Sequence, residues 1–140
     1  SLKGTIGRES EIDFIIYRYA DVLTLLSEAI VRNAGSVTQE AIDLLNEVRT
    51  RAGITNYQLS DIPSVENFLD KVLLERGHEL YFEGSRREDL IRHGKFVESI
   101  REKAQRAGEV TTINENMKLL PLPQWLIDEG QGKIEQNPGY

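Results

Sequence analysis

The sequence has no cysteine, and only four prolines, two histidines and one tryptophan among its 140 residues. Without cysteine it has no disulfide, no thiolate zinc site and no cysteine nucleophile. It has no basic excess either, because the net charge is −6, which excludes electrostatic attraction to nucleic acid or an anionic membrane. Its apolar runs fall far short of the ~18 residues that span a bilayer. What remains is the composition of one ordinary globular domain, with 39% apolar and 29% charged residues.

The first ten residues, SLKGTIGRES, start without Met and look like neither a cleaved leader nor a first structural element. We therefore expect residues 1–140 to form a single helical domain that is a piece of a longer protein. Missing targeting signals are then uninformative.

Residues 13–53 predict a helical hairpin. Residues 14–34 have apolar positions with a period near 3.6, and Gly35 is the expected end of this first helix. The expected inward positions are Ile15, Tyr19, Val22, Leu26, Ala29 and Ile30. The expected outward positions are Arg18, Asp21, Glu28 and Arg32.

The second helix is expected to begin at Ser36 or Thr38 and to end at Gly53. Its i,i+4 spacing predicts a pair between Glu47 and Arg51. Its expected inward positions are Ala41, Leu44, Leu45, Val48 and Ala52. The short connection makes the two helices antiparallel, and together they have the length of a tetratricopeptide unit.

Residues 64–107 predict two more helices. The first is expected from Val65 to about Phe82, with Ser64 as its cap, and Gly84 interrupts the pattern after it. The second is expected from about Arg87 to Ala107, with a possible bend at Gly94. Its expected inward positions are Leu90, Ile91, Phe96, Val97, Ile100 and Ala104.

Residues 108–140 show no helical period, and two Leu-Pro steps favour extended backbone. Only Lys118 to Leu122 alternates like a strand. The predicted fold class is all-α, with about four helices in tetratricopeptide-like hairpins and an extended, Pro-containing C-terminal tail.

The stretch ERGHELYFEGSRREDLIRHG, residues 75–94, raises the main functional question. One continuous helix would align Arg76, Glu79, Glu83 and Arg86 on the side that also carries Leu69, Val72, Leu73 and Leu80. Such a charged stripe can be an acid–base site, a metal site or a set of buried struts, meaning buried ion pairs that hold neighbouring segments together.

The first two interpretations are disfavoured. Glu79 and Glu83 would lie side by side on one helix face, whereas the carboxylates of a glycosidase face each other across a substrate. Arg76 and Arg86 would also hold both acids ionised. His78 and Glu83 do not have the spacing of a His-Glu-x-x-His zinc motif. We therefore expect no catalytic residue, no metal and no cofactor, and favour buried struts, in which losing one member costs ~3–5 kcal/mol.

Several segments carry a family resemblance. YRYADVLTLLSEAI, AIDLLNEVRTRAGI, ERGHELYFEGSRREDLIRHGKF, LLPLP and QNPGY occur in the order found in the C-terminal part of SusD/RagB-like proteins. These are surface glycan-capture lipoproteins of Bacteroidetes-type outer membranes. The chain resembles them from about Ile15 to Tyr140, and departs from the usual pattern at Arg87 and Glu88 and at Gly130 and Gly132.

The resemblance implies a non-catalytic role in nutrient uptake and polysaccharide utilisation. Family members are lipid-anchored at the cell-surface face of the outer membrane, bind oligosaccharides and hand them to a SusC-like TonB-dependent transporter. It implies that this chain is mainly helical scaffold, with the glycan contacts largely in segments it lacks. The structural motif implied by the resemblance comprises Glu75, Arg76, Glu79, Glu83, Gly84, Arg86 and Asp89.

Two aromatic residues are weak candidates for ligand binding, because sugars stack on aromatic faces. Trp125 follows LPLPQ in the tail, and Tyr57 lies in the loop after the second helix. A tail tryptophan more often pins its own segment to the fold. The alternative function for the whole chain is a tetratricopeptide-like protein–protein interaction adaptor, and a glycosidase using Glu79 or Glu83 is the remaining rival.

Overall fold

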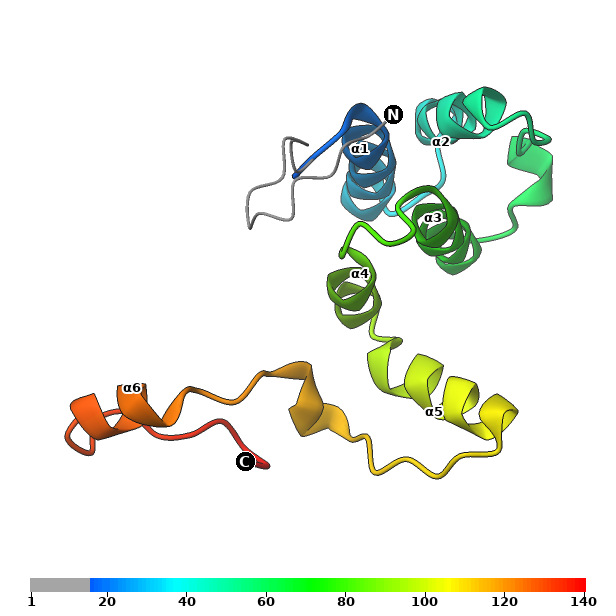
Figure 1. The fold of residues 1–140 in the computed structure, drawn as a ribbon. Helices are drawn as coiled ribbons and strands as arrows, with labels where there is room; N and C mark the ends of the chain where they lie inside the picture. Colours follow the sequence, from blue (N-terminus) through cyan, green and yellow to red (C-terminus); the bar gives the residue numbers. More distant parts are fainter. Residues whose placement is uncertain (1–15) are drawn as a thin grey trace, which may run out of the picture. The chain divides into compact units, whose positions relative to one another are not determined.

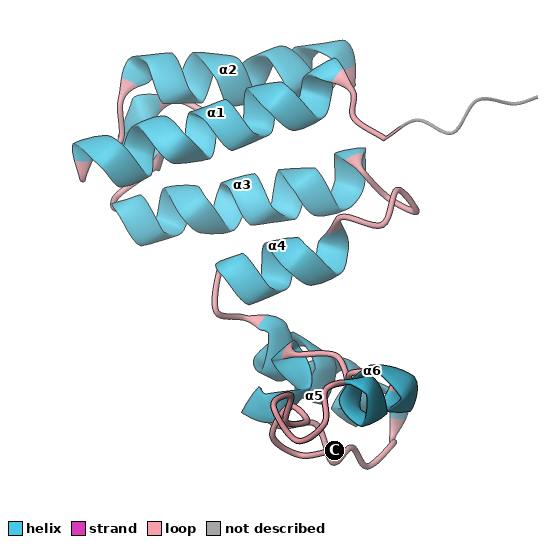
Figure 2. Ribbon diagram, turned by 90° about the vertical axis from the view of Figure 1, so that its left-hand side faces the viewer, coloured by secondary structure: helices cyan, strands magenta, loops and turns pink. Residues whose placement is uncertain are grey.

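The computed structural model describes residues 16–140, whose helices are shown in Figure 1. In chain order these are α1 (Tyr19–Ala34), α2 (Gln39–Arg51), the 3₁₀ helix η1 (Leu59–Asp61), α3 (Val65–Glu79), α4 (Arg86–Arg92), α5 (Phe96–Ala107), the 3₁₀ helix η2 (Glu115–Lys118) and α6 (Gln124–Glu129). Residues 16–140 contain no β-strand (Figure 2), so the predicted all-α class is confirmed. The chain divides into two compact units, Ser1–Glu79 and Leu80–Tyr140.

The first unit is a three-helix arrangement in which α1 and α2 form an antiparallel hairpin and α3 packs along it (Figures 1 and 2). Its main core consists of Val31, Ala41, Ile42, Leu45, Ile62, Phe68 and Val72. A smaller apolar cluster of Ala20, Leu23 and Val48 lies between α1 and α2.

The predicted helix ends of this unit follow from local hydrogen bonds. Gly35 has a φ of 64° and its N–H donates to the carbonyl of Val31, so it ends α1 as expected. Thr38 accepts a hydrogen bond from the N–H of Ala41 at 3.2 Å, and is the cap of α2. Ser64 accepts from the N–H of Asn67 at 3.1 Å and caps α3.

The predicted orientation of α1 is wrong. Asp21, Thr24, Ser27 and Glu28 are buried, whereas Tyr19, Val22 and Leu26 are 67%, 52% and 46% exposed. Ala29 is also exposed, Ile30 is half-buried, and Ile15 lies outside the described residues. The helix therefore turns its polar side inward, where Asp21 and Thr24 accept hydrogen bonds from Arg76 of α3 and Ser27 donates one to the carbonyl of Ala41 in α2.

In α2 the expected inward positions Ala41, Leu45 and Val48 are buried and Leu44 is half-buried. Ala52 is exposed, because the helix ends at Arg51 and Ala52 only caps it.

The third and fourth helices differ from their expected bounds. α3 ends at Glu79 rather than at Phe82, and Phe82 has a φ of 65°, which excludes it from a right-handed helix. The expected helix from Arg87 to Ala107 is divided at Gly94, whose φ is 69°. There the N–H of Lys95 donates to the carbonyl of Leu90 and closes α4, so the possible bend is a complete break.

Within the second unit Leu90, Phe96, Val97 and Ala104 are buried as expected, while Ile91 and Ile100 are half-buried. The tail contains the short helices η2 and α6, which were not predicted because four and six residues are too few to show a helical period. Lys118 to Leu122 is not a strand. None of the helices between residues 16 and 140 has the length and apolarity to cross a membrane.

The outward apolar side of α1 predicts self-association of the chain. Tyr19, Val22 and Leu26 lie at i, i+3 and i+7, so their side chains form one apolar stripe on the exposed side of the helix. We expect Val22→Glu to lower the tendency to dimerise by about tenfold, since a charge would have to be buried in the contact. Sedimentation velocity over a concentration series measures this.

Gln105→Glu is the matched control, because it adds the same charge at an exposed position of α5. Equal sedimentation of the parent chain and the Val22→Glu variant at all concentrations would contradict the prediction.

Candidate functional site

Arg76 of α3 points its buried guanidinium at α1. Its Nη1 donates to Oδ1 of Asp21 at 2.6 Å and to Oγ1 of Thr24 at 2.8 Å. The Arg76 side chain is 3% exposed and Thr24 is fully buried. A guanidinium remains charged in such a place and is costly to bury without a carboxylate and further acceptors. Asp21 and Thr24 supply these acceptors, which is why they face inward.

A second ion pair joins α3 to α2. Nη1 of Arg49 lies 2.6 Å from Oε2 of Glu75, whose side chain is 3% exposed. Arg49 also donates from Nε to the backbone carbonyl of Thr55 at 2.8 Å, and its guanidinium carbon is 3.9 Å from the ring centroid of Tyr57. This arginine therefore ties the loop after α2 to both helices.

Glu79, at the end of α3, accepts from two arginines. Its Oε1 lies 2.5 Å from Arg18, the residue before α1, and its Oε2 lies 2.5 Å from Arg51, the last residue of α2. The predicted pair between Glu47 and Arg51 is thus replaced by a contact between helices. Both oxygens of Glu79 are engaged, and the carboxylate joins the ends of three helices.

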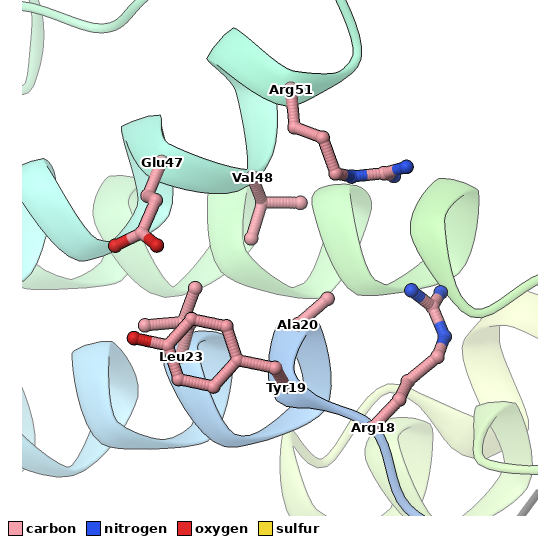
Figure 3. Close-up of a pocket in the computed structure, with 7 residues that line it drawn as sticks. All are labelled: Arg18, Tyr19, Ala20, Leu23, Glu47, Val48 and Arg51. Atoms are coloured by element: carbon pink, nitrogen blue, oxygen red, sulfur yellow. The ribbon is translucent and has the colours of Figure 1, made fainter.

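A pocket of about 370 Å³ lies between α1 and α2 (Figure 3). Its lining consists of Arg18, Tyr19, Ala20, Leu23, Glu47, Val48 and Arg51. Figure 3 shows Ala20, Leu23 and Val48 between the two helices, with the two arginines at one end and Glu47 at the other. The pocket combines an apolar floor with charged groups at its edges, a composition common in binding sites. The sequence patterns did not indicate it.

The remaining members of the charged motif belong to the second unit. Glu83 and Arg86 are exposed, Gly84 has a φ of 88°, and Asp89 is buried. Nη2 of Arg92 donates to Oδ1 of Asp89 at 2.9 Å. A salt-bridge corner between the third and fourth helices stays a prediction.

The arrangement offers no general acid–base pair at the two glutamates considered above. Glu79 ends α3 and is held by two guanidinium groups, whereas Glu83 lies in the turn that follows, so the two are not on one helix face. Among residues 16–140, no three or more His, Asp or Glu side chains gather as metal ligands would. His78 is exposed on α3, and His93 caps the end of α4.

The two aromatic candidates have different surroundings. The ring of Tyr57 is half-buried and lies near two cations, with Nζ of Lys71 at 4.5 Å from its centroid in addition to Arg49. Its main-chain N–H and C=O are both bonded to the side chain of Asn46. Trp125 lies in α6 rather than in an extended segment, and is 61% exposed. The structure thus leaves the Trp125 ring much freer to stack on a ligand.

Other exposed aromatic residues were missed. Tyr81 and Phe82 are 74% and 91% exposed, and their rings meet edge to face with centroids 4.7 Å apart. They were not singled out because the sequence predicted a helix that continued to about Phe82, whereas α3 ends at Glu79. The sequence also did not identify Asp21 and Thr24 as the partners of Arg76. A signal was present, because one side of the first helix is polar, with steps of three, three and one between Asp21, Thr24, Ser27 and Glu28.

The chain matches known proteins over nearly its whole length. The model of the SusD family matches residues 2–140. The SusD-like protein P38 of Formosa agariphila is 35% identical over 93% of this chain, which corresponds to 25% of that protein. The chain spans about a quarter of the length of the curated relatives it matches.

Two solved structures share the fold. A SusD homolog from Bacteroides thetaiotaomicron superposes with a TM-score of 0.80 at 28% identity, covering 96% of this chain and 30% of that one. The surface glycan-binding protein A from Bacteroides thetaiotaomicron gives a TM-score of 0.70 at 34% identity, covering 89% of this chain and 24% of that one.

Removing Arg76 is expected to destabilise the first unit strongly. Arg76→Met leaves Asp21 buried without its cation, so we expect the free energy of unfolding to fall by ~3–5 kcal/mol. Urea denaturation measures the change. The matched control is Arg106→Met in α5, whose ion pair with Glu102 is largely exposed and is expected to contribute below about 1 kcal/mol. Equal stabilities of the two variants would show that the buried pair is not a strut.

Proposed function

The chain belongs to the SusD family, and we propose that it is the C-terminal helical scaffold of a longer glycan-binding surface lipoprotein. Family membership and the likeness to a solved surface glycan-binding protein support glycan binding by the whole protein. The share of relatives that the chain covers, about a quarter, supports its being one part of that protein.

The observation that carries the scaffold role is the buried contact of Arg76 with Asp21 and Thr24. A ligand site presents its charged groups to solvent or to an open pocket, whereas this guanidinium is 3% exposed and points into the contact between α1 and α3. Its charge is used to fix one helix against another. The proposed protein catalyses nothing, and the charged motif is architectural.

The exposed stripe of Tyr19, Val22 and Leu26 fits the same proposal. An apolar stripe of this kind on a small unit is normally covered. In the longer protein, we expect other segments to pack on this side of α1 and on the pocket beside it.

The proposed anchor and transporter partner of the longer protein rest on its family membership. The longer protein is proposed to be lipid-anchored on the cell-surface face of the outer membrane and to hand oligosaccharides to a SusC-like TonB-dependent transporter. Within this chain Trp125 is the foremost candidate for a sugar contact, and Tyr57 ranks lower because Arg49 and Lys71 lie over its ring.

A second candidate function rests on the pocket between α1 and α2. A tetratricopeptide-like adaptor would bind a peptide segment there, with an apolar side chain on the floor formed by Ala20, Leu23 and Val48. Saturable binding of a defined peptide that Val48→Asp abolishes, without loss of helix content, would favour the adaptor over the scaffold.

Calorimetric titration with a panel of soluble plant and host polysaccharides tests the proposed function. The chain and a full-length relative with the same C-terminal part are titrated side by side. We expect heat of binding from the full-length protein and none from the chain, because the scaffold lacks the glycan site. Binding by neither protein to any glycan of the panel would count against glycan capture.

Binding by the chain alone would contradict the scaffold role and make Trp125→Ala the decisive variant. Loss of one exposed stacking surface should then weaken binding by about 0.5–1.5 kcal/mol. Tyr81→Ala serves as the matched control, because it removes another exposed ring.

A further inference from the structure

The last five residues, Gln136 to Tyr140, run back along the segment that precedes α6 (Figure 1). We call residues 136–140 the strap, and residues 116–122 the partner segment. Neither is a β-strand: the partner segment begins in η2 and continues as irregular backbone, and the strap contains a turn at residues 138–139. Two prolines in LPLP explain this, since Pro121 and Pro123 have no N–H to donate to a strand ladder.

The strap replaces main-chain pairing with a side-chain amide. Oε1 of Gln136 accepts from the N–H of Leu122 at 2.8 Å, and its Nε2 donates to the carbonyl of Leu122 at 3.0 Å. Leu122 has the single N–H between the two prolines. A carboxamide offers both an acceptor and a donor, so it satisfies both main-chain groups of this residue as an antiparallel strand would.

The other strap residues continue the same order. Nδ2 of Asn137 donates to the carbonyl of Leu120 at 2.6 Å, and the hydroxyl of Tyr140 donates to the carbonyl of Leu119 at 3.1 Å. The sequence separations of the three contacts are 14, 17 and 21 residues, so the pairing is nested and antiparallel.

Gly139 lets the strap approach closely. Its φ is 96°, and a Cβ placed on it would lie 3.2 Å from Cβ of Asn116. A side chain at this position would be strained and would also push against the partner segment.

The partner segment is held from its other end by α4. Nη2 of Arg87 donates to the carbonyls of Met117 and Lys118 at 3.2 and 3.0 Å. The segment is thus fixed on both sides, while α6 and its exposed Trp125 form the loop that the strap closes.

From these contacts we propose that residues 136–140 act as a side-chain strap, which pairs with residues 116–122 and holds α6 with Trp125 in one preset position. This device is independent of the proposed function. It predicts that the position of the loop around Trp125 depends on the carboxamide of Gln136.

Amide hydrogen exchange of Leu122 and the fluorescence anisotropy of Trp125, the single tryptophan, test the strap in the full chain. Gln136→Met keeps the length of the side chain but removes its acceptor and donor, so exchange at Leu122 should rise at least about tenfold. The anisotropy of Trp125 should fall at the same time. Gln136→Glu keeps only the acceptor and should give an intermediate exchange rate.

Gln105→Met is the matched control, since it makes the same substitution at an exposed position of α5. Gly139→Ala provides a second route to the same effect and should also speed exchange at Leu122. Exchange and anisotropy in Gln136→Met and Gly139→Ala that stay within about twofold of the control would overturn the proposal. The glycan titrations do not bear on this result.

Discussion

The buried guanidinium of Arg76 determines the arrangement of the first unit. A charged group in this position needs a carboxylate and further acceptors within hydrogen-bonding distance, and Asp21 and Thr24 provide them. Meeting that need rotates α1 so that its polar side faces α3. The apolar residues Tyr19 and Val22 are consequently left outside. One electrostatic requirement therefore decides which surface of the unit remains to be covered by something else.

Much of the fold was predictable where local chemistry decides the structure. Gly35, Thr38 and Ser64 end or begin their helices through single hydrogen bonds that a sequence reveals. The orientation of α1 was not predictable from its own period, because the apolar residues form the stronger stripe and the decisive charge lies 55 residues away. The predicted end of the third helix at Phe82 was wrong for a different reason: Phe82 adopts a left-handed conformation that its residue type disfavours.

In the candidate site, too, the residues of the motif could be predicted from the sequence but their partners could not. Arg76 and Glu79 were chosen as structural residues for their spacing, and Glu75 for the family resemblance. Their partners Asp21, Arg18 and Arg49 come from other parts of the chain, which only the fold brings close. In the second unit the tail looked featureless, because its order depends on side chains such as Gln136 that bind main-chain groups. The distant partner in such a contact cannot be identified from the sequence, even where one side of a helix is polar, as in α1. Polar groups in both units are satisfied by distant side chains.

The two guanidinium groups on Glu79 have a topological consequence. Arg18 stands directly before α1 and Glu79 is the last residue of α3, so one carboxylate brings the two ends of the three-helix arrangement together. A unit whose two connections meet at one point can be inserted into a longer polypeptide, or lost from it, with little displacement of the flanking segments. The hairpin and α3 therefore form a loop that Glu79 closes at its base, while the exposed side of α1 still leaves this loop in need of a cover.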